Sequence, residues 1–166
     1  QSLNEIIKRH EILRTNFIVV DGQPVQIIQP EFNINLLVKD LQQLPQSNRT
    51  TESQHLIKKL AQQTFDLSSQ PLLRAQLLRL GEEYQLVLIL NHIIVDGWSI
   101  GILNRELATI YEALVNGKPS PLPELPIQYL DFTYWQQRWL QGDRLQTLIT
   151  YWKQQLGGNL PVLNLP

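Results

Sequence analysis

The chain has 166 residues, 43% of them hydrophobic and 17% charged, with a formal net charge of −1. This length predicts about one domain with an apolar core, and the balanced charge argues against a nucleic-acid-binding surface, which would show a basic excess. Cysteine is absent, which excludes disulfides and thiolate metal sites. No apolar run reaches the roughly 20 residues needed to cross a bilayer and no signal peptide is recognisable, so we expect a cytoplasmic protein that binds no membrane.

The first half of the chain alternates helical and strand patterns. Asp21-Gly22 is a strong turn signal between two short apolar runs, which together predict a β-hairpin. In chain order, the predicted elements are a helix, the two hairpin strands, a third strand and a helix, at residues 2–12, 17–20, 25–28, 33–39 and about 52–65. The first helical pattern is already under way at Gln1, so we expect the chain to be a piece of a longer polypeptide.

The second half adds another hairpin and three helices. The predicted elements are two strands, a helix, a proline-rich extended connection and two helices, at residues 72–80, 84–90, 98–115, 117–126, 130–140 and 144–156. Asp131 is a plausible helix N-cap, and Trp135, Trp139 and Trp152 are expected in the core. Hairpins mixed with helices predict an α+β sandwich, with helices packed on a largely antiparallel or mixed sheet.

The candidate reaction centre is the connection 91–99 (NHIIVDGWS), which joins the apolar strand 84–90 to the helix beginning near Trp98. A connection held by a rigid scaffold is a common place for functional residues. His92 can move protons near neutral pH. Gly97 lets a backbone N–H come close to a reacting carbonyl, where a Cβ would block the approach. These properties make His92 and Gly97 the candidate catalytic residues.

The same connection also matches a nucleophile elbow, since Gly97, Ser99 and Gly101 have the spacing Gly-x-Ser-x-Gly. Hydrolase triads on that elbow follow the order Ser, acid, His, whereas every histidine of this chain precedes Ser99. The hairpin-rich sheet also differs from the mostly parallel hydrolase sheet. A serine hydrolase therefore stays an alternative, and the other role for Ser99 is to cap the helix.

Four segments in order resemble a known family. Residues 91–97 resemble the His-His-x-x-x-Asp-Gly motif of nonribosomal peptide synthetase condensation domains, with Asn91 in place of the first His. Trp98-Ser99 follows as in peptide-bond-forming members, which favours condensation over epimerisation. The other three segments resemble the motifs Arg-His-Glu-x-Leu-Arg-Thr-x-Phe, Tyr-x-Asp-Phe/Tyr-x-x-Trp-Gln and Tyr-Trp…Leu-Pro, at residues 9–17, 129–136 and 151–166.

The resemblance implies a chloramphenicol-acetyltransferase-like fold of two similar lobes with an active-site tunnel between them. Residues 1–166 would be the N-terminal lobe, without its first segment and without the second lobe. The implied reaction joins an upstream acyl or peptidyl thioester to the amine of a downstream aminoacyl thioester. Phosphopantetheine arms of upstream and downstream peptidyl carrier domains would hold both substrates, beside an adjacent adenylation domain. No cofactor or metal would be bound by the chain itself.

The resemblance also implies a role for each motif residue. His92 either removes a proton from the acceptor amine or positions that amine. Asp96 shapes the loop by pairing with an arginine, for which Arg14 is the first candidate and Arg9 the second. The first His of the family is largely structural, with its ring hydrogen-bonded behind the loop, and Asn91 can donate and accept hydrogen bonds in its place. It is also the one feature that supports an alternative, a non-catalytic carrier-docking module. By itself, the chain is expected to be inactive.

Overall fold

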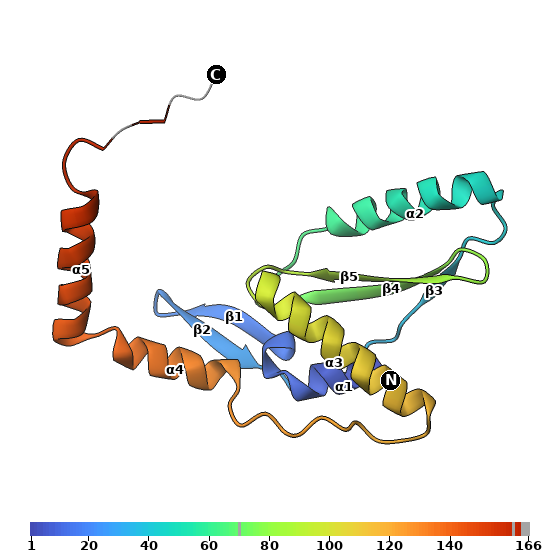
Figure 1. Cartoon of the computed structure of the whole chain (residues 1–166), viewed down its shortest axis with the longest axis horizontal. Helices are drawn as coiled ribbons and strands as arrows, with labels where there is room; N and C mark the ends of the chain where they lie inside the picture. Colours follow the sequence, from blue (N-terminus) through green and yellow to red (C-terminus); the bar gives the residue numbers. More distant parts are fainter. Residues whose placement is uncertain (70, 161, 164–166) are drawn as a thin grey trace. The chain divides into compact units, whose positions relative to one another are not determined.

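The computed structural model describes residues 1–69, 71–160, 162 and 163. Residues 161 and 164–166 of the last resembling segment, 151–166, therefore lie outside the described residues. The chain divides into two compact units, residues 1–126 and 127–166. The first unit contains, in chain order, α1 (Ser2–Arg9), a 3₁₀ turn η1 (Glu11–Arg14), β1 (Thr15–Val20), β2 (Gln23–Ile28), β3 (Val38–Asp40), α2 (Gln46–Ala61), β4 (Leu73–Arg79), β5 (Tyr84–Leu90) and α3 (Gly97–Val115) (Figure 1).

The strands form two small sheets. β1 and β2 make an antiparallel hairpin, whose turn residues Asp21 and Gly22 have φ values of 50° and 76°. Positive φ at both positions fits the hairpin turn that Asp-Gly favours. The second sheet has the order β3-β4-β5, with β3 parallel to β4 and β4 antiparallel to β5. Both predicted hairpins and the mixed sheet are confirmed.

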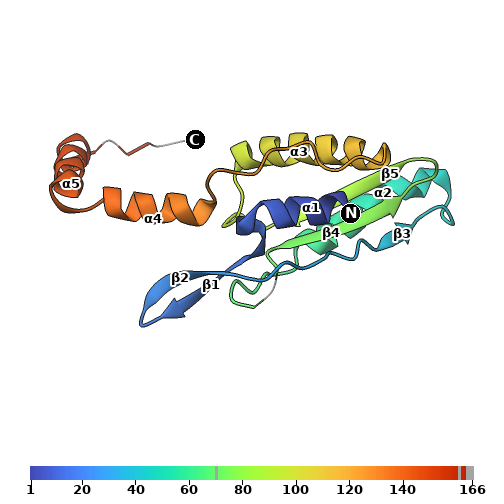
Figure 2. The same cartoon turned by 90° about the horizontal axis from the view of Figure 1, so that it is seen from below.

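Helices cover both faces of the three-stranded sheet: α2 lies along one face, and α1 and α3 lie side by side on the other (Figures 1 and 2). The main core forms beneath α1 and α3, where burial of each large apolar side chain contributes about 1.5–3 kcal/mol. Its buried members are Ile6, Ile7, Leu13, Leu72, Leu73, Ile94, Leu103 and Ile110. Ile94 belongs to the predicted reaction centre, so this core holds the middle of the connection between β5 and α3.

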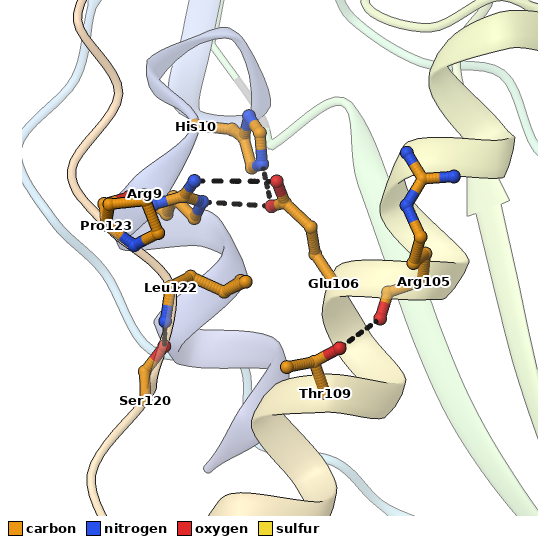
Figure 3. A network of polar contacts seen from close by, with 8 residues as sticks. All are labelled: Arg9, His10, Arg105, Glu106, Thr109, Ser120, Leu122 and Pro123. Atoms are coloured by element: carbon orange, nitrogen blue, oxygen red, sulfur yellow. Dashed lines mark hydrogen bonds and ion pairs between the residues drawn. The ribbon is translucent and has the colours of Figure 1, made fainter.

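A polar clamp, made of Arg9, His10 and Glu106, joins α1 to α3 (Figure 3). The Glu106 carboxylate accepts a 2.9 Å hydrogen bond from Arg9 Nε and lies 2.7 Å from His10 Nε2. Arg9 also donates to the carbonyl oxygen of Pro123, in the proline-rich connection. Burial alone would raise the pKa of Glu106, but the hydrogen bonds and charges of His10 and Arg9 lower it overall. The clamp thus ties three separate segments together.

The second unit consists of α4 (Tyr129–Trp139) and α5 (Gly142–Leu156), and neither helix has a buried residue among those described. The predicted cap is corrected here: Gln128 is the N-cap of α4, and Asp131 accepts from its backbone N–H at 2.8 Å as the third residue of a capping box. The predicted burial of the three tryptophans is also wrong. Trp135, Trp139 and Trp152 are 53%, 39% and 55% exposed.

Several element boundaries differ from the prediction, including the end of α2, which lies at Ala61 and not near residue 65. The first helix ends at Arg9 because His10 takes an extended conformation, after which η1 leads into β1. The third strand pairs only over β3, so most of residues 33–39 lies outside the ladder. The helix α2 begins six residues earlier than predicted, since Arg49 in its first turns donates to the carbonyls of Gln42, Leu44 and Leu80. None of the described helices is both long and apolar enough to cross a membrane.

Candidate functional site

The connection between β5 and α3 begins with Asn91, which makes three hydrogen bonds. Its backbone N–H donates to Leu72 O at 2.9 Å and so extends the β4–β5 pairing by one residue. Its side-chain Oδ1 accepts from the backbone N–H of Ile93 at 3.0 Å, and its carbonyl accepts from Ile94 N–H at 3.1 Å. The side-chain bond closes an Asx turn around the residue between them, His92.

The residues of this turn differ in how deeply their side chains are buried. Ile94 is 5% exposed and belongs to the core, whereas Ile93 is 42% exposed and His92 is exposed. The imidazole therefore lies at the surface of the first unit. The residues on either side of it are held, Asn91 by a hydrogen bond to the sheet and Ile94 by burial in the core. A ring in this position can accept or donate a proton without first being released from a packed environment.

Asp96 ends the connection as the N-cap of α3. Its Oδ1 accepts from the backbone N–H of Ser99 at 2.8 Å and from Ser99 Oγ at 2.6 Å. The bond from the Ser99 hydroxyl, followed by the one from its backbone N–H, lowers the pKa of Asp96 below its usual value. The carboxylate satisfies N–H groups that the first helical turn leaves free. The cap is thus Asp96, where the sequence pattern suggested Ser99.

The expected pairing of Asp96 with Arg14 is wrong for this structure. Among the described residues, Asp96 is exposed and forms no ion pair. Arg14 instead donates to Gln29 O at 2.7 Å and to the Glu11 carboxylate at 3.2 Å, which fixes η1 to the end of β2. The second candidate, Arg9, is bound to Glu106. An exposed carboxylate that receives helix N–H groups does not need a guanidinium partner.

Gly97 and Trp98 stand at the open start of α3. A Cβ placed on Gly97 would meet nothing within 4 Å, and Gly97 is not among the residues with positive φ. Neither packing within the described part of the chain nor backbone conformation therefore requires glycine here. Trp98 is 82% exposed, which is unusual for so large an aromatic side chain. Gly97, which has no side chain, and the exposed ring of Trp98 thus lie in the same connection as His92.

The nucleophile-elbow alternative fails on geometry. An elbow serine sits on a strained turn between a strand and a helix. Ser99 instead lies within the first turn of α3, and its hydroxyl is engaged by Asp96. The one non-glycine residue with positive φ in the described ranges is Asp21, in the hairpin turn. The structure therefore gives no support to a serine nucleophile at this position.

The site is an open surface of the first unit. A groove of about 630 Å³ runs between α1, α3 and the sheet, but no residue of the connection 91–99 lines it. Within the described ranges, no three His, Asp or Glu side chains gather in a way that could hold a metal ion. The structure thus brings Asn91, His92, Asp96, Gly97, Trp98 and Ser99 together in one connection and leaves Arg14 in a different contact.

A family model described as "Condensation domain" matches residues 1–166. The chain belongs to the condensation-domain family. A linear gramicidin synthase protein of Brevibacillus parabrevis is 46% identical over 167 residues, which cover 100% of this chain and 2% of that protein. Chondramide synthase of Chondromyces crocatus is 44% identical over 167 residues, which cover 100% of this chain and 4% of that protein. This condensation-domain chain therefore spans a small part of the length of the curated relatives it matches.

Solved structures share the fold. The starter condensation domain of the rhizomide synthetase RzmA superposes with a TM-score of 0.81 at 22% identity, over 94% of this chain and 37% of that one. The X-domain in the "Complex of the X-domain and OxyB from Teicoplanin Biosynthesis" superposes with a TM-score of 0.80 at 28% identity, over 99% of this chain and 36% of that one. The predicted α+β, chloramphenicol-acetyltransferase-like fold is confirmed for this condensation-domain chain.

Proposed function

We propose that this chain provides one wall of the reaction centre of a condensation domain that forms amide bonds in nonribosomal peptide synthesis. The amine of a downstream aminoacyl thioester attacks the carbonyl carbon of an upstream acyl or peptidyl thioester. The C–N bond forms, the C–S bond breaks, and the proton lost by the amine ends on the released thiol. Membership of the family and the peptide synthetases among its relatives support this reaction.

The observation that carries the proposal is the placement of His92. Its side chain is exposed at the tip of a turn whose backbone is hydrogen-bonded to the sheet and anchored in the core by Ile94. A rigid backbone with an accessible imidazole suits either removal of a proton from the amine or orientation of that amine. A Cβ on Gly97 would meet nothing within 4 Å, and in this proposal the Gly97 backbone N–H donates to the thioester oxygen.

Residues 1–166 form the N-terminal lobe in this proposal, and a second lobe supplies the opposite wall of the tunnel. The fold neighbour from the rhizomide synthetase is longer than this chain, which covers 37% of it, and this supports the assignment. Peptidyl carrier domains on both sides bring the substrates on phosphopantetheine arms, and an adenylation domain loads the downstream carrier. The whole assembly works in the cytoplasm.

The first prediction tests the role of His92. In the complete protein that contains this chain, His92→Ala should lower the rate of amide formation by about 10² or more, because a positioned acid–base group contributes about 10²–10⁴. Mass spectrometry of loaded carrier domains measures the product. His55→Ala is the matched control, since His55 is also exposed but lies on α2. Near-normal turnover by His92→Ala would contradict the proposed function.

A second candidate is a docking module that keeps the fold without turnover. The X-domain that superposes on this chain is described in a complex with OxyB, and Asn91 departs from the family motif. Because such a module takes no part in the chemistry, this candidate predicts that His92→Ala leaves the product formed by the complete protein unchanged, while substitutions on the domain surface weaken binding of a partner protein. Comparing turnover with partner binding in the same variants separates the two functions.

A further inference from the structure

We infer that Asn91 is a positioning residue whose side-chain carbonyl, by closing an Asx turn over His92, sets the direction in which the imidazole is presented. The inference rests on the proposed function, because it concerns how His92 is held for that reaction. Asn91 departs from the motif that the chain otherwise follows. The contacts of its side chain show what this substitution contributes.

The first step of the argument is the way in which the turn is closed. Asn91 Oδ1 accepts from Ile93 N–H at 3.0 Å, and the Asn91 carbonyl accepts from Ile94 N–H at 3.1 Å. Both bonds join Asn91 to residues that follow His92, so the backbone of His92 lies within the turn that they close. Hydrogen bonding by an Asn side chain to the N–H two residues later restricts that backbone as a turn would.

The second step is that His92 has little else to hold it. Its side chain is exposed, and Ile93 beside it is 42% exposed, so burial does not fix the ring. Among the described residues, His92 makes no ion pair and its ring forms no hydrogen bond. Its backbone therefore sets the direction of the Cα–Cβ bond that carries the ring. Displacement of a reacting group by about 1 Å can lower a rate by about 10².

The third step concerns charge. An amide acceptor closes the turn without adding a charge next to the imidazole, whereas a carboxylate would close the same turn and favour the protonated ring. Asn91→Asp and Asn91→Leu therefore separate the two properties. The first keeps the acceptor and adds a negative charge, and the second removes the acceptor at nearly constant size.

The experiment uses the complete protein that contains this chain and measures kcat and KM across pH. We expect Asn91→Leu to lower kcat by about tenfold or more with little change in KM, because the turn is lost while substrate contacts stay. Asn91→Asp should keep kcat near the wild-type value at its optimum and should move the acid limb of the pH profile to higher pH. Asn35→Leu and Asn35→Asp, at an exposed asparagine outside the motif, are the matched controls and should change neither.

Hydrogen exchange supplies a readout that needs no turnover. In Asn91→Leu, the amide of Ile93 should exchange several-fold faster than in the wild type, and in Asn91→Asp it should stay protected. Wild-type kcat and exchange in Asn91→Leu would overturn the inference, as would equal losses in Asn91→Leu and Asn91→Asp. If His92→Ala is inactive while Asn91→Leu is normal, the inference fails alone; normal turnover by His92→Ala contradicts the proposed function itself.

Discussion

At the scale of single residues, Asp96 illustrates how a carboxylate in a family motif can be misread. The family resemblance implied an ion pair with Arg14, and a carboxylate removed from water does require a cation. The structure instead has an exposed Asp96 that caps α3 through Ser99, three residues later. That spacing is the usual distance from an N-cap to the residue whose N–H it accepts, so the sequence did contain the signal. The N-cap was assigned to Ser99, which lies three residues after the actual N-cap, Asp96.

This cap predicts a pH-dependent contribution to stability. The pKa of Asp96 is lowered in the folded state from its ordinary value of 3.8. Its contribution is therefore fully present above that value and is lost as pH falls through the lower folded pKa. Asp96→Asn keeps an acceptor that does not titrate, so thermal unfolding should show a weaker dependence on pH below about 4. Asp96→Ala should lower Tm at neutral pH as well.

The control for this measurement is Asp131→Asn, which changes a carboxylate of the capping box in the second unit. If Asp96→Ala and Asp96→Asn have the same Tm at neutral pH, the side-chain oxygen does not cap α3.

Replacement of Arg14 should be additive with replacement of Asp96, since the two residues have different partners. A large coupling between them would restore the ion pair that the sequence suggested.

At the scale of elements, the clamp of Arg9, His10 and Glu106 predicts that α1 and α3 are coupled through one carboxylate. Glu106→Gln should destabilise the fold by about 1.5–3 kcal/mol, the range for hydrogen bonds to charged groups. The lowered pKa of Glu106 means that its contribution is present above the ordinary value of 4.5 and declines as pH falls through the lower folded value. Denaturant unfolding at several pH values measures both effects.

Glu112→Gln is the matched control for the clamp, because Glu112 is an exposed glutamate on the same helix. A double-mutant cycle with Arg9→Met should give a coupling of about 0.5–3 kcal/mol, since the two groups share a hydrogen bond of 2.9 Å. Additive changes would mean that the clamp contributes nothing specific and that packing alone holds α1 against α3.

The hairpins and α3 could be predicted from sequence because their signals are local. Asp21-Gly22 specifies the turn of the first hairpin, and a short turn separates the apolar runs of β4 and β5. The start of α2 could not be predicted in this way. Its first turns are polar and are held by Arg49, whose three carbonyl acceptors lie 5 to 31 residues away in the sequence. Such a tertiary contact outweighs weak local propensity.

The candidate site, too, could be predicted from the sequence only in part. The residues that form it, from Asn91 to Ser99, are contiguous, so their order alone brings them together. The hydrogen bonds within it depend on dihedral angles, and the sequence could not specify that Asn91 bonds to Ile93 or that Asp96 bonds to Ser99. The role of Arg14 failed for a further reason, since a partner far along the chain cannot be identified from spacing.

At the scale of the whole molecule, the second unit shows why its core residues were misjudged. Aromatic rings follow one another along α4, with centroids 5.7 to 5.8 Å apart. Helical spacing correctly groups these rings on one face, but periodicity does not say what covers that face. Within the described part of this unit, no residue of either helix is buried. Burial is a property of the assembled protein, which the pattern of one segment cannot supply.

The last prediction is that residues 1–166 alone form no amide bond above background, even with correctly loaded carrier domains. His92 lies on an exposed surface, and the chain covers 37% of a condensation domain of known structure. Orientation of two reactants can supply about 7–11 kcal/mol of a reaction barrier, and an open surface loses most of it. Water would also reach the thioester, so slow hydrolysis should be the only reaction that mass spectrometry detects. Amide product from the purified chain, abolished by His92→Ala, would show that one lobe suffices and that a second wall is unnecessary.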